Sequence, residues 1–216
     1  MAVGFALAAC AGGPGSEAAS SGPAGSHHGQ VDVIREAVVA GDVPATREPA
    51  RWLSTHQGRE YPAVAASSLA AMREQGRTML AQTDILPVAR TLGRMGVACA
   101  ACHTALEARV KFPVELPPPT STNLPQQMHR HAWAVDRLWE GLVGPSNASW
   151  IAGASALLGI PVDFGDNPQA NRLAARVQDL AAQARHATTP ERRADVYGDV
   201  LETCALCHSA LRMRVR

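Results

Sequence analysis

The sequence is organised around the stretch Cys99-Ala-Ala-Cys102-His103, which occurs a second time as Cys204-Ala-Leu-Cys207-His208. In a helix, residues three and four positions apart lie on one face, so the two cysteines and the histidine of each motif point the same way. Each motif therefore presents two thiols and one imidazole from a single helical turn.

This pattern, C-x-x-C-H, is the signature of covalent c-type haem attachment. Two thiols at this spacing can reach the two vinyl groups on one edge of a porphyrin, and the histidine can bind the iron as its proximal ligand. We therefore expect two covalently bound haem c groups. The expected attachment residues are Cys99, Cys102, Cys204 and Cys207, and the expected proximal ligands are His103 and His208.

Two other interpretations of the cysteines are weaker. A zinc site also uses thiolate and imidazole, but its remaining ligands usually come from a separate element, whereas here each histidine directly follows the second cysteine. A thioredoxin-like redox pair is expected within a βαβ unit, and the sequence shows no strand pattern. Four of the five cysteines lie in the two motifs, which leaves too few for a disulfide framework.

The composition favours a helical protein, because alanine is abundant and β-branched runs are rare. Aromatic residues make up only 4% of the 216 residues, a shortage that a buried porphyrin would offset. The formal net charge of +1 does not indicate a nucleic-acid partner. No catalytic triad, phosphate-binding loop or dinucleotide fingerprint is present, so we predict no catalytic residues and no enzymatic activity.

The N-terminal segment resembles a signal for export and lipidation. Leu7-Ala-Ala-Cys10 is similar to a bacterial lipobox, in which cleavage precedes a cysteine that then carries lipid. The match departs from the usual pattern, because the apolar stretch is short and no Lys or Arg precedes it. The alternative is an apolar tail with an idle thiol. The following residues up to 26 are mostly Gly, Ser, Ala and Pro, which predicts a flexible tether.

The remainder of the chain consists of two related halves. Residues 102–111 align with 207–216 at an offset of 105, and Glu36-Ala-Val-Val39 aligns with Glu140-Gly-Leu-Val143 at an offset of 104. A nearly constant offset at both ends indicates a duplication. We expect a signal and tether over 1–26, a first haem-binding helical domain over 27–112 and a second over 126–216. The proline-rich residues 113–125 between them predict an extended linker.

Each half is predicted to contain about four helices, with the haem motif on the last. The motif of the first half belongs to one apolar stripe at steps of three and four, formed by Val88, Leu92, Met95, Cys99, Cys102, Leu106 and Val110. In the second half, Asn167-Pro168 and Thr189-Pro190 each predict a helix start. The stripe predicts that the porphyrin faces the interior of a helical bundle.

A haem motif near the C-terminal end of the last helix of a four-helix unit resembles the cytochrome c′ type of helical-bundle cytochrome, here duplicated in tandem. The resemblance covers residues 27–216 and rests on the two C-x-x-C-H motifs and the architecture. It implies an all-α fold of two tandem four-helix bundles, each with a covalent haem on its last helix. Because each half is shorter than a typical member, we expect the early helices to be abbreviated.

The second axial ligand of each iron decides the function. His27 and His131 are equivalent in the repeat, at the start of the first helix of each half, and in the family this helix supplies the distal side of the haem. We expect His27 to bind the first iron and His131 the second. His28 is an alternative to His27, and Met128 or His129 to His131. The histidines near the tether could instead be solvent-exposed, with Met128 part of the core.

The sequence thus predicts a dihaem electron carrier that exchanges electrons with redox partner proteins. Covalent haem attachment in bacteria takes place outside the cytoplasmic membrane. We therefore expect the protein in the periplasm or on the outer side of the envelope, with Cys10 as the candidate lipid anchor. An open distal site would instead indicate a gas-binding or sensing haemoprotein, or a dihaem peroxidase-like enzyme.

Overall fold

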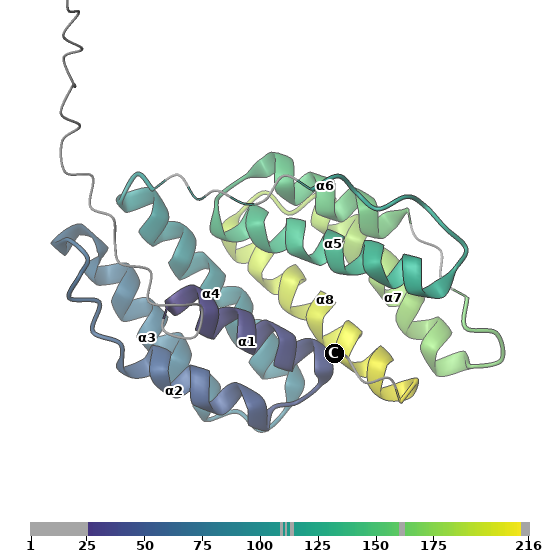
Figure 1. Ribbon diagram of the computed structural model, residues 1–216, viewed down its shortest axis with the longest axis horizontal. Helices are drawn as coiled ribbons and strands as arrows, with labels where there is room; N and C mark the ends of the chain where they lie inside the picture. Colours follow the sequence, from purple (N-terminus) through teal and green to yellow (C-terminus); the bar gives the residue numbers. More distant parts are fainter. Residues whose placement is uncertain (1–25, 109, 111, 113–114, 160–162, 213–216) are drawn as a thin grey trace, which may run out of the picture.

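The computed structural model describes residues 26–108, 110, 112, 115–159 and 163–212. These residues form eight α-helices and two short 3₁₀ helices and contain no strand, which confirms the prediction of an all-α protein (Figure 1). The α-helices are α1 (His27–Ala40), α2 (Arg47–Thr55), α3 (Ala66–Leu80), α4 (Ile85–Ala105), α5 (Leu124–Val143), α6 (Asn147–Leu158), α7 (Pro168–Arg185) and α8 (Pro190–Ala210). The 3₁₀ helices are η2 (Pro44–Thr46) and η3 (Ala63–Ala65). Cys10 and nearly all of the predicted tether lie outside the described residues.

Short polar side chains begin most of the helices. The side chains of Asn167 and Thr189 accept hydrogen bonds from backbone N–H groups in the first turns of α7 and α8, which confirms both predicted helix starts. Asn123 caps α5 in the same way, so this helix begins one residue before Pro125, within the predicted linker. A proline in the first turn loses no intrahelical hydrogen bond, which explains why the helix extends past it.

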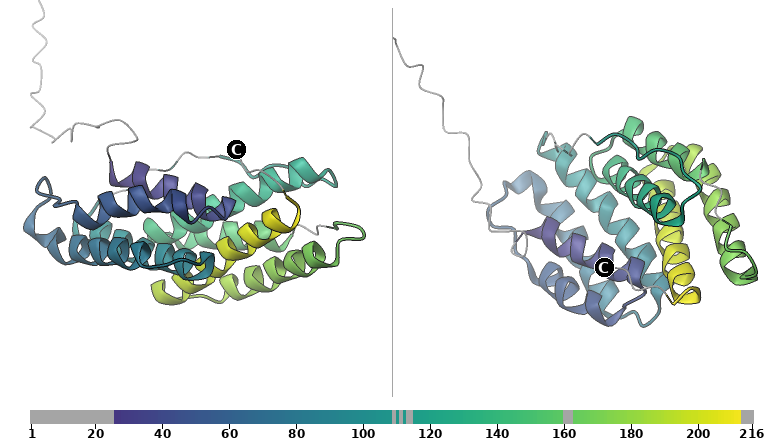
Figure 2. Two further views of the ribbon diagram at one scale, coloured as in Figure 1. Left: turned by 90° about the horizontal axis from the view of Figure 1, so that it is seen from below. Right: turned by 45° about the vertical axis from the view of Figure 1, so that its right-hand side comes forward.

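The two halves of the sequence form two neighbouring groups of helices. Within each group, consecutive helices pack against each other, from α1 to α4 and from α5 to α8. The groups meet mainly where α4 packs along α8, the two helices that carry the cysteine motifs (Figure 2). Further contacts join α1 to α8 and α4 to α5, so the first helix of each half also reaches the motif helix of the other.

The crossing of α4 and α8 is close because each helix places a glycine against the other. A Cβ atom on Gly93 would clash with the backbone of Ala194. A Cβ atom on Gly198 would lie 2.8 Å from the Cα atom of Arg90 and 3.0 Å from the carbonyl oxygen of Ala89. The two glycines are equivalent in the repeat, as are the two alanines, so the crossing is symmetric with respect to the duplication.

One continuous hydrophobic core runs through both groups of helices. It includes Leu53 from the first half and Trp150 from the second, both fully buried. At the junction, the rings of Trp139 on α5 and Tyr197 on α8 lie 5.5 Å apart between their centroids. Aromatic side chains thus help to join the two groups of helices at the junction.

Helix α4 is long and apolar enough to cross a membrane by length and composition alone. Half of the window that meets this criterion is buried inside the protein, because α4 packs against α3, α5 and α8. Its apolar character is that of a central core helix.

Candidate functional site

The two cysteine motifs lie at the C-terminal ends of α4 and α8, as predicted. All four of their cysteines are free thiols; Cys99 is buried, and Cys102, Cys204 and Cys207 are partly exposed. Burial raises the pKa of the Cys99 thiol to about 12, and burial likewise raises that of Cys204 to about 12. The first thiol of each motif is therefore protonated at neutral pH, although Cys204 is somewhat more exposed than Cys99.

The motif histidines make equivalent hydrogen bonds to backbone carbonyls. The Nδ1 of His103 donates to the carbonyl oxygen of Val143 at 2.8 Å, and the Nδ1 of His208 donates to that of Val39 at 3.1 Å. Because a carbonyl only accepts, Nδ1 of each ring carries a proton. The lone pair of Nε2 is then available to a metal, which is the arrangement that supporting hydrogen bonds give to histidine ligands.

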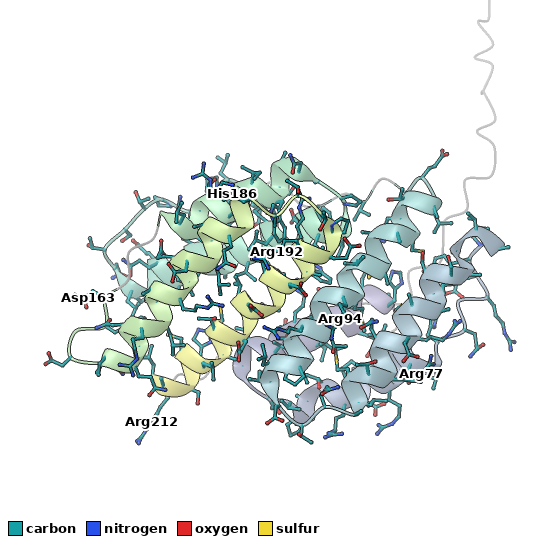
Figure 3. The ribbon with its side chains drawn as sticks, turned by 180° about the vertical axis from the view of Figure 1, so that it is seen from behind. Arg77, Arg94, Asp163, His186, Arg192 and Arg212 are labelled. Atoms are coloured by element: carbon teal, nitrogen blue, oxygen red, sulfur yellow. The ribbon has the colours of Figure 1, made fainter. Side chains whose placement is uncertain are left out.

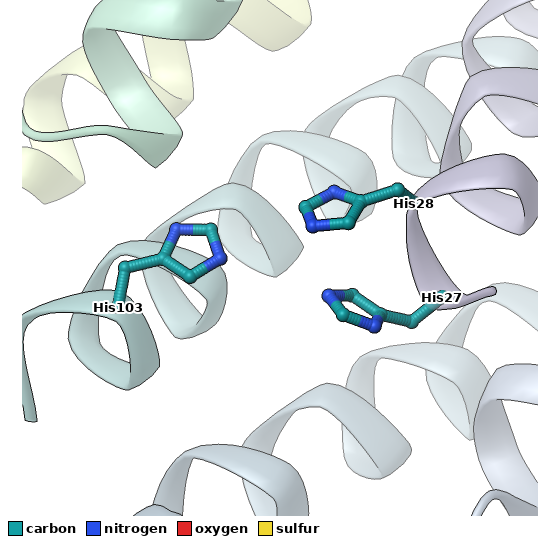
Figure 4. A group of neighbouring side chains, drawn as sticks. All are labelled: His27, His28 and His103. Atoms are coloured by element: carbon teal, nitrogen blue, oxygen red, sulfur yellow. The ribbon is translucent and has the colours of Figure 1, made fainter. Parts of the chain in front are cut away.

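Two further histidines meet the first motif. His27 and His28 project from the start of α1 toward His103 on α4 (Figure 4). One ring nitrogen from each of the three residues can be chosen so that all three lie within 4.8 Å of one another. Two metal–imidazole bonds of about 2 Å on opposite sides of one ion would place their nitrogens roughly 4 Å apart. This limit is compatible with two imidazoles on a shared metal.

His27 and His28 differ in their surroundings. The Nδ1 of His27 lies 3.2 Å from the hydroxyl of Tyr61, and this hydrogen bond holds the ring in place. Burial, reinforced by the neighbouring histidines, lowers the pKa of His27 to about 4, so its ring is neutral at pH 7. His28 is more exposed, and its ring stacks on that of His103 with centroids 5.8 Å apart. Both histidines therefore remain candidates for the position opposite His103.

In the described part of the chain, the histidine that interacts with the second motif is His131 of α5. Burial, with a smaller contribution from His208, lowers the pKa of His131 to about 4. The Nε2 of His131 is buried and has no hydrogen-bond partner among the described residues. A buried polar atom normally has a partner, so the unpartnered Nε2 makes His131 a candidate ligand. His131 therefore lies close enough to His208 for the two rings to interact electrostatically, and its binding to the second iron stays a prediction.

The two alternatives to His131 are less well placed. His129 is exposed and lies two residues away along α5, which turns its side chain to a nearly opposite face of the helix. Met128 lies three residues away, on the same face as His131, and is partly buried. Met128 therefore shares the helix face of His131, whereas His129 lies on another face.

A separate groove of about 320 Å³ lies between α3 and α4. Ala98 and Ala101 line it from α4, together with Arg94, which is on the face shown in Figure 3. These residues occupy a different face of α4 from Cys99 and His103. The groove is therefore not part of the cluster of histidines.

Sequence reasoning missed the residues that support the histidines. Tyr61 lies between α2 and α3, in a segment without periodicity, and nothing in the sequence connects it with His27. Val39 and Val143 contribute only backbone carbonyls, which carry no side-chain signature. They are nevertheless the final residues of the short aligned segments that revealed the duplication, so the repeat itself was the available signal.

Comparisons with protein-family models, with curated proteins and with solved structures found no match for this chain.

Proposed function

We propose that the protein is an exported dihaem c-type cytochrome that acts in electron transfer, built from two tandem four-helix bundles with one covalent haem on the last helix of each. The observation that carries this proposal is the meeting of histidines at each motif. His27 and His28 lie beside His103, and His131 lies near His208. Each motif therefore has a second imidazole from the first helix of its own half.

The residues present fit a haem iron at each motif. The thiols of Cys99 and Cys102 would attach the first haem and those of Cys204 and Cys207 the second, while His103 and His208 would be the proximal ligands. Bound haem supplies reversible one-electron chemistry, with a potential set by its axial ligands and their hydrogen bonds. The chain contributes the free Nε2 atoms, the neutral state of the buried histidines and the burial of the first cysteine.

The neighbouring histidines favour electron transfer over the two other functions considered. A gas-binding haemoprotein or a peroxidase-like enzyme needs an axial position that an external ligand can occupy. A histidine opposite each proximal ligand would fill both positions, which suits a carrier that passes electrons between redox partner proteins. Because no axial position would be left for a substrate, we propose that the protein is not an enzyme.

The haem content of the protein tests this proposal. Protein made in a host that attaches haem should contain two haems per chain by the pyridine haemochrome assay, and they should remain bound in a denaturing gel. Cys102→Ala and Cys207→Ala should each reduce the covalently bound haem from two to about one. Stoichiometric zinc without haem in the unaltered protein would reject the proposal.

Cys10→Ala is a matched control for the thiol substitutions, because it removes a cysteine outside both motifs. We expect it to retain both haems. If Cys10 carries lipid, the unaltered protein should partition into membranes and Cys10→Ala should not. An unmodified Cys10 in the intact mass of the mature protein would contradict the lipid anchor while leaving the haem proposal intact.

A further inference from the structure

Each motif histidine is held by the other half of the chain. His103 belongs to α4, whereas Val143, which accepts its Nδ1 proton, is the last residue of α5. His208 belongs to α8, and its acceptor Val39 lies in the last turn of α1. Val39 and Val143 are equivalent positions of the duplication. The two hydrogen bonds therefore form a reciprocal exchange between the halves.

The acceptors are available because they lie at helix C-termini. The last carbonyls of a helix have no intrahelical N–H partner, and the negative end of the helix dipole favours a donor there. The backbone turns back to earlier carbonyls in the same way after both helices: Asp42 N–H donates to the Ala37 carbonyl at 2.8 Å, and Ser146 N–H donates to the Gly141 carbonyl at 3.1 Å. This leaves the carbonyls of both valines free for the imidazoles.

The packing between the halves determines the geometry of these bonds. The motif helices α4 and α8 cross closely through Gly93 and Gly198, and α1 packs on α8 as α5 packs on α4. A displacement of one half relative to the other would therefore move both carbonyls away from their imidazoles. The two halves act as one structural unit at the motifs.

We propose that each half completes the proximal side of the haem site of the other half, so that the redox potential of each haem depends on a helix from the opposite half. This inference rests on the proposed function. A hydrogen-bond acceptor on Nδ1 raises the basicity of an imidazole ligand and favours the oxidised metal. Val39 and Val143 are thus positioning residues that act through His208 and His103.

The first test changes the end of α1, in the first half, and measures the haem of the second half. Gly41 caps α1 with a φ of 73°, a conformation that a β-branched residue rarely adopts. Gly41→Val should therefore displace the Val39 carbonyl from His208. We expect the midpoint potential of the second haem to rise and that of the first to stay at its wild-type value. His131→Ala identifies which haem is which, because it changes the second haem alone.

Gly165→Val is the matched control. Gly165 also has a positive φ, of 56°, but a Cβ atom there would meet nothing within 4 Å. It lies in the second half, in the loop between α6 and α7. We expect both potentials to remain unchanged. The inference would be overturned if Gly41→Val changed the midpoint potential of the first haem alone. It would also be overturned if Gly41→Val changed the potential of the second haem no more than Gly165→Val does.

The reciprocal variant guards against a misfolded Gly41→Val protein. Gly144 caps α5, and a Cβ atom there would lie 2.9 Å from the ring of Phe112. Gly144→Ala should shift the end of α5 and raise the potential of the first haem, although residue 144 belongs to the second half. A change confined to the second haem would contradict reciprocal support.

A measurement on haem-free protein separates this inference from the proposed function. Nitrogen NMR should show His103 and His208 protonated on Nδ1 in the unaltered protein, and Gly41→Val should abolish this preference for His208 alone. Absence of haem from the unaltered protein would reject the proposed function, but the NMR measurement would still test the inference. Absence of the Nδ1 preference in the unaltered protein would reject the inference even if both haems were bound.

Discussion

At the scale of single residues, the hydrogen bonds of the histidines at and near each motif determine which ring nitrogens can bind a metal. The motif histidines have their protons held on Nδ1 by carbonyls, and His27 has its Nδ1 bound to the Tyr61 hydroxyl. His131 differs, because its buried Nε2 has no partner in the described part of the chain. These arrangements leave the Nε2 atoms of the motif histidines available to a metal, and they predict how each site responds to loss of a histidine.

We predict that His131→Ala opens the second haem alone. His131 is the proposed second ligand of this iron and interacts electrostatically with His208, so its removal should leave one axial position for external ligands. The altered haem should become high-spin and bind carbon monoxide rapidly, while the first haem stays low-spin. His129→Ala is the control, because the side chain of His129 is exposed on another face of α5. The spectrum of this variant should match that of the unaltered protein. Rapid carbon monoxide binding at both haems of the unaltered protein would contradict this ligand assignment.

The first haem should behave differently, because two histidines lie beside His103. His27→Ala should leave His28 able to reach the metal, so we expect a low-spin spectrum with a shifted potential. The double variant His27→Ala/His28→Ala should give a high-spin first haem that binds carbon monoxide. Optical and electron paramagnetic resonance spectra of the three proteins measure this difference. An open first haem in His28→Ala alone would show that His27 is not a ligand.

At the scale of secondary-structure elements, the fold depends on the close crossing of α4 and α8. Glycine at positions 93 and 198 brings two backbones together, so this crossing tolerates no added side chain. The same crossing positions both motifs, which lie further along these two helices. The apolar stripe of α4 was predictable from its period, but its partner helix was not, because periodicity shows which face is buried and not what covers it.

We predict that Gly93→Ala lowers the free energy of unfolding by about 1–3 kcal/mol, because the added methyl group would overlap the backbone of Ala194. This loss should appear despite the roughly 1 kcal/mol that alanine gains over glycine inside a helix. Gly159→Ala is the control, since its nearest contact would be an ordinary 3.6 Å. Chemical denaturation of the haem-free proteins measures both values. If Gly93→Ala were as stable as Gly159→Ala, the two helices would be able to move apart at the crossing without loss of stability.

At the scale of the whole molecule, the two halves share one core and one polar junction. Arg35 on α1 is central to this junction, because it pairs with Asp136 on α5 and its Nε donates to the hydroxyl of Tyr197 on α8 at 3.1 Å. Its guanidinium also lies 5.3 Å from the centre of the Trp139 ring. A single side chain from the first half thus contacts two helices of the second.

We predict that Arg35→Met lowers the free energy of unfolding by roughly 1–3 kcal/mol, because it removes charged hydrogen bonds from a side chain that is only 17% exposed. Arg51→Met is the matched control. Arg51 also pairs with an acid three residues earlier, but its side chain is 60% exposed, so we expect a change within about 0.5 kcal/mol. Thermal or chemical unfolding of both variants checks the difference. If Arg35→Met and Arg51→Met changed the free energy of unfolding equally, the interactions of Arg35 at the junction would contribute little to stability.

The sequence by itself determined the features that depend on residues within a few positions of one another. These are the helical class, the two C-x-x-C-H motifs on the last helix of each half, the capped starts at Asn167 and Thr189, and the duplication. Through the repeat it also suggested which histidines would meet each motif. The described structure brings His27 and His131 to those places, although their binding to iron stays a prediction.

Only the tertiary structure decided which half supports which motif. The acceptors of His103 and His208 are backbone carbonyls in the opposite half, and a carbonyl is present at every residue, so no pattern of side chains could single them out. The crossing at Gly93 and Gly198 likewise depends on the approach of two helices more than 100 residues apart in the chain. Local sequence patterns specified the candidate ligands, and packing between the halves specified how the motif histidines are held.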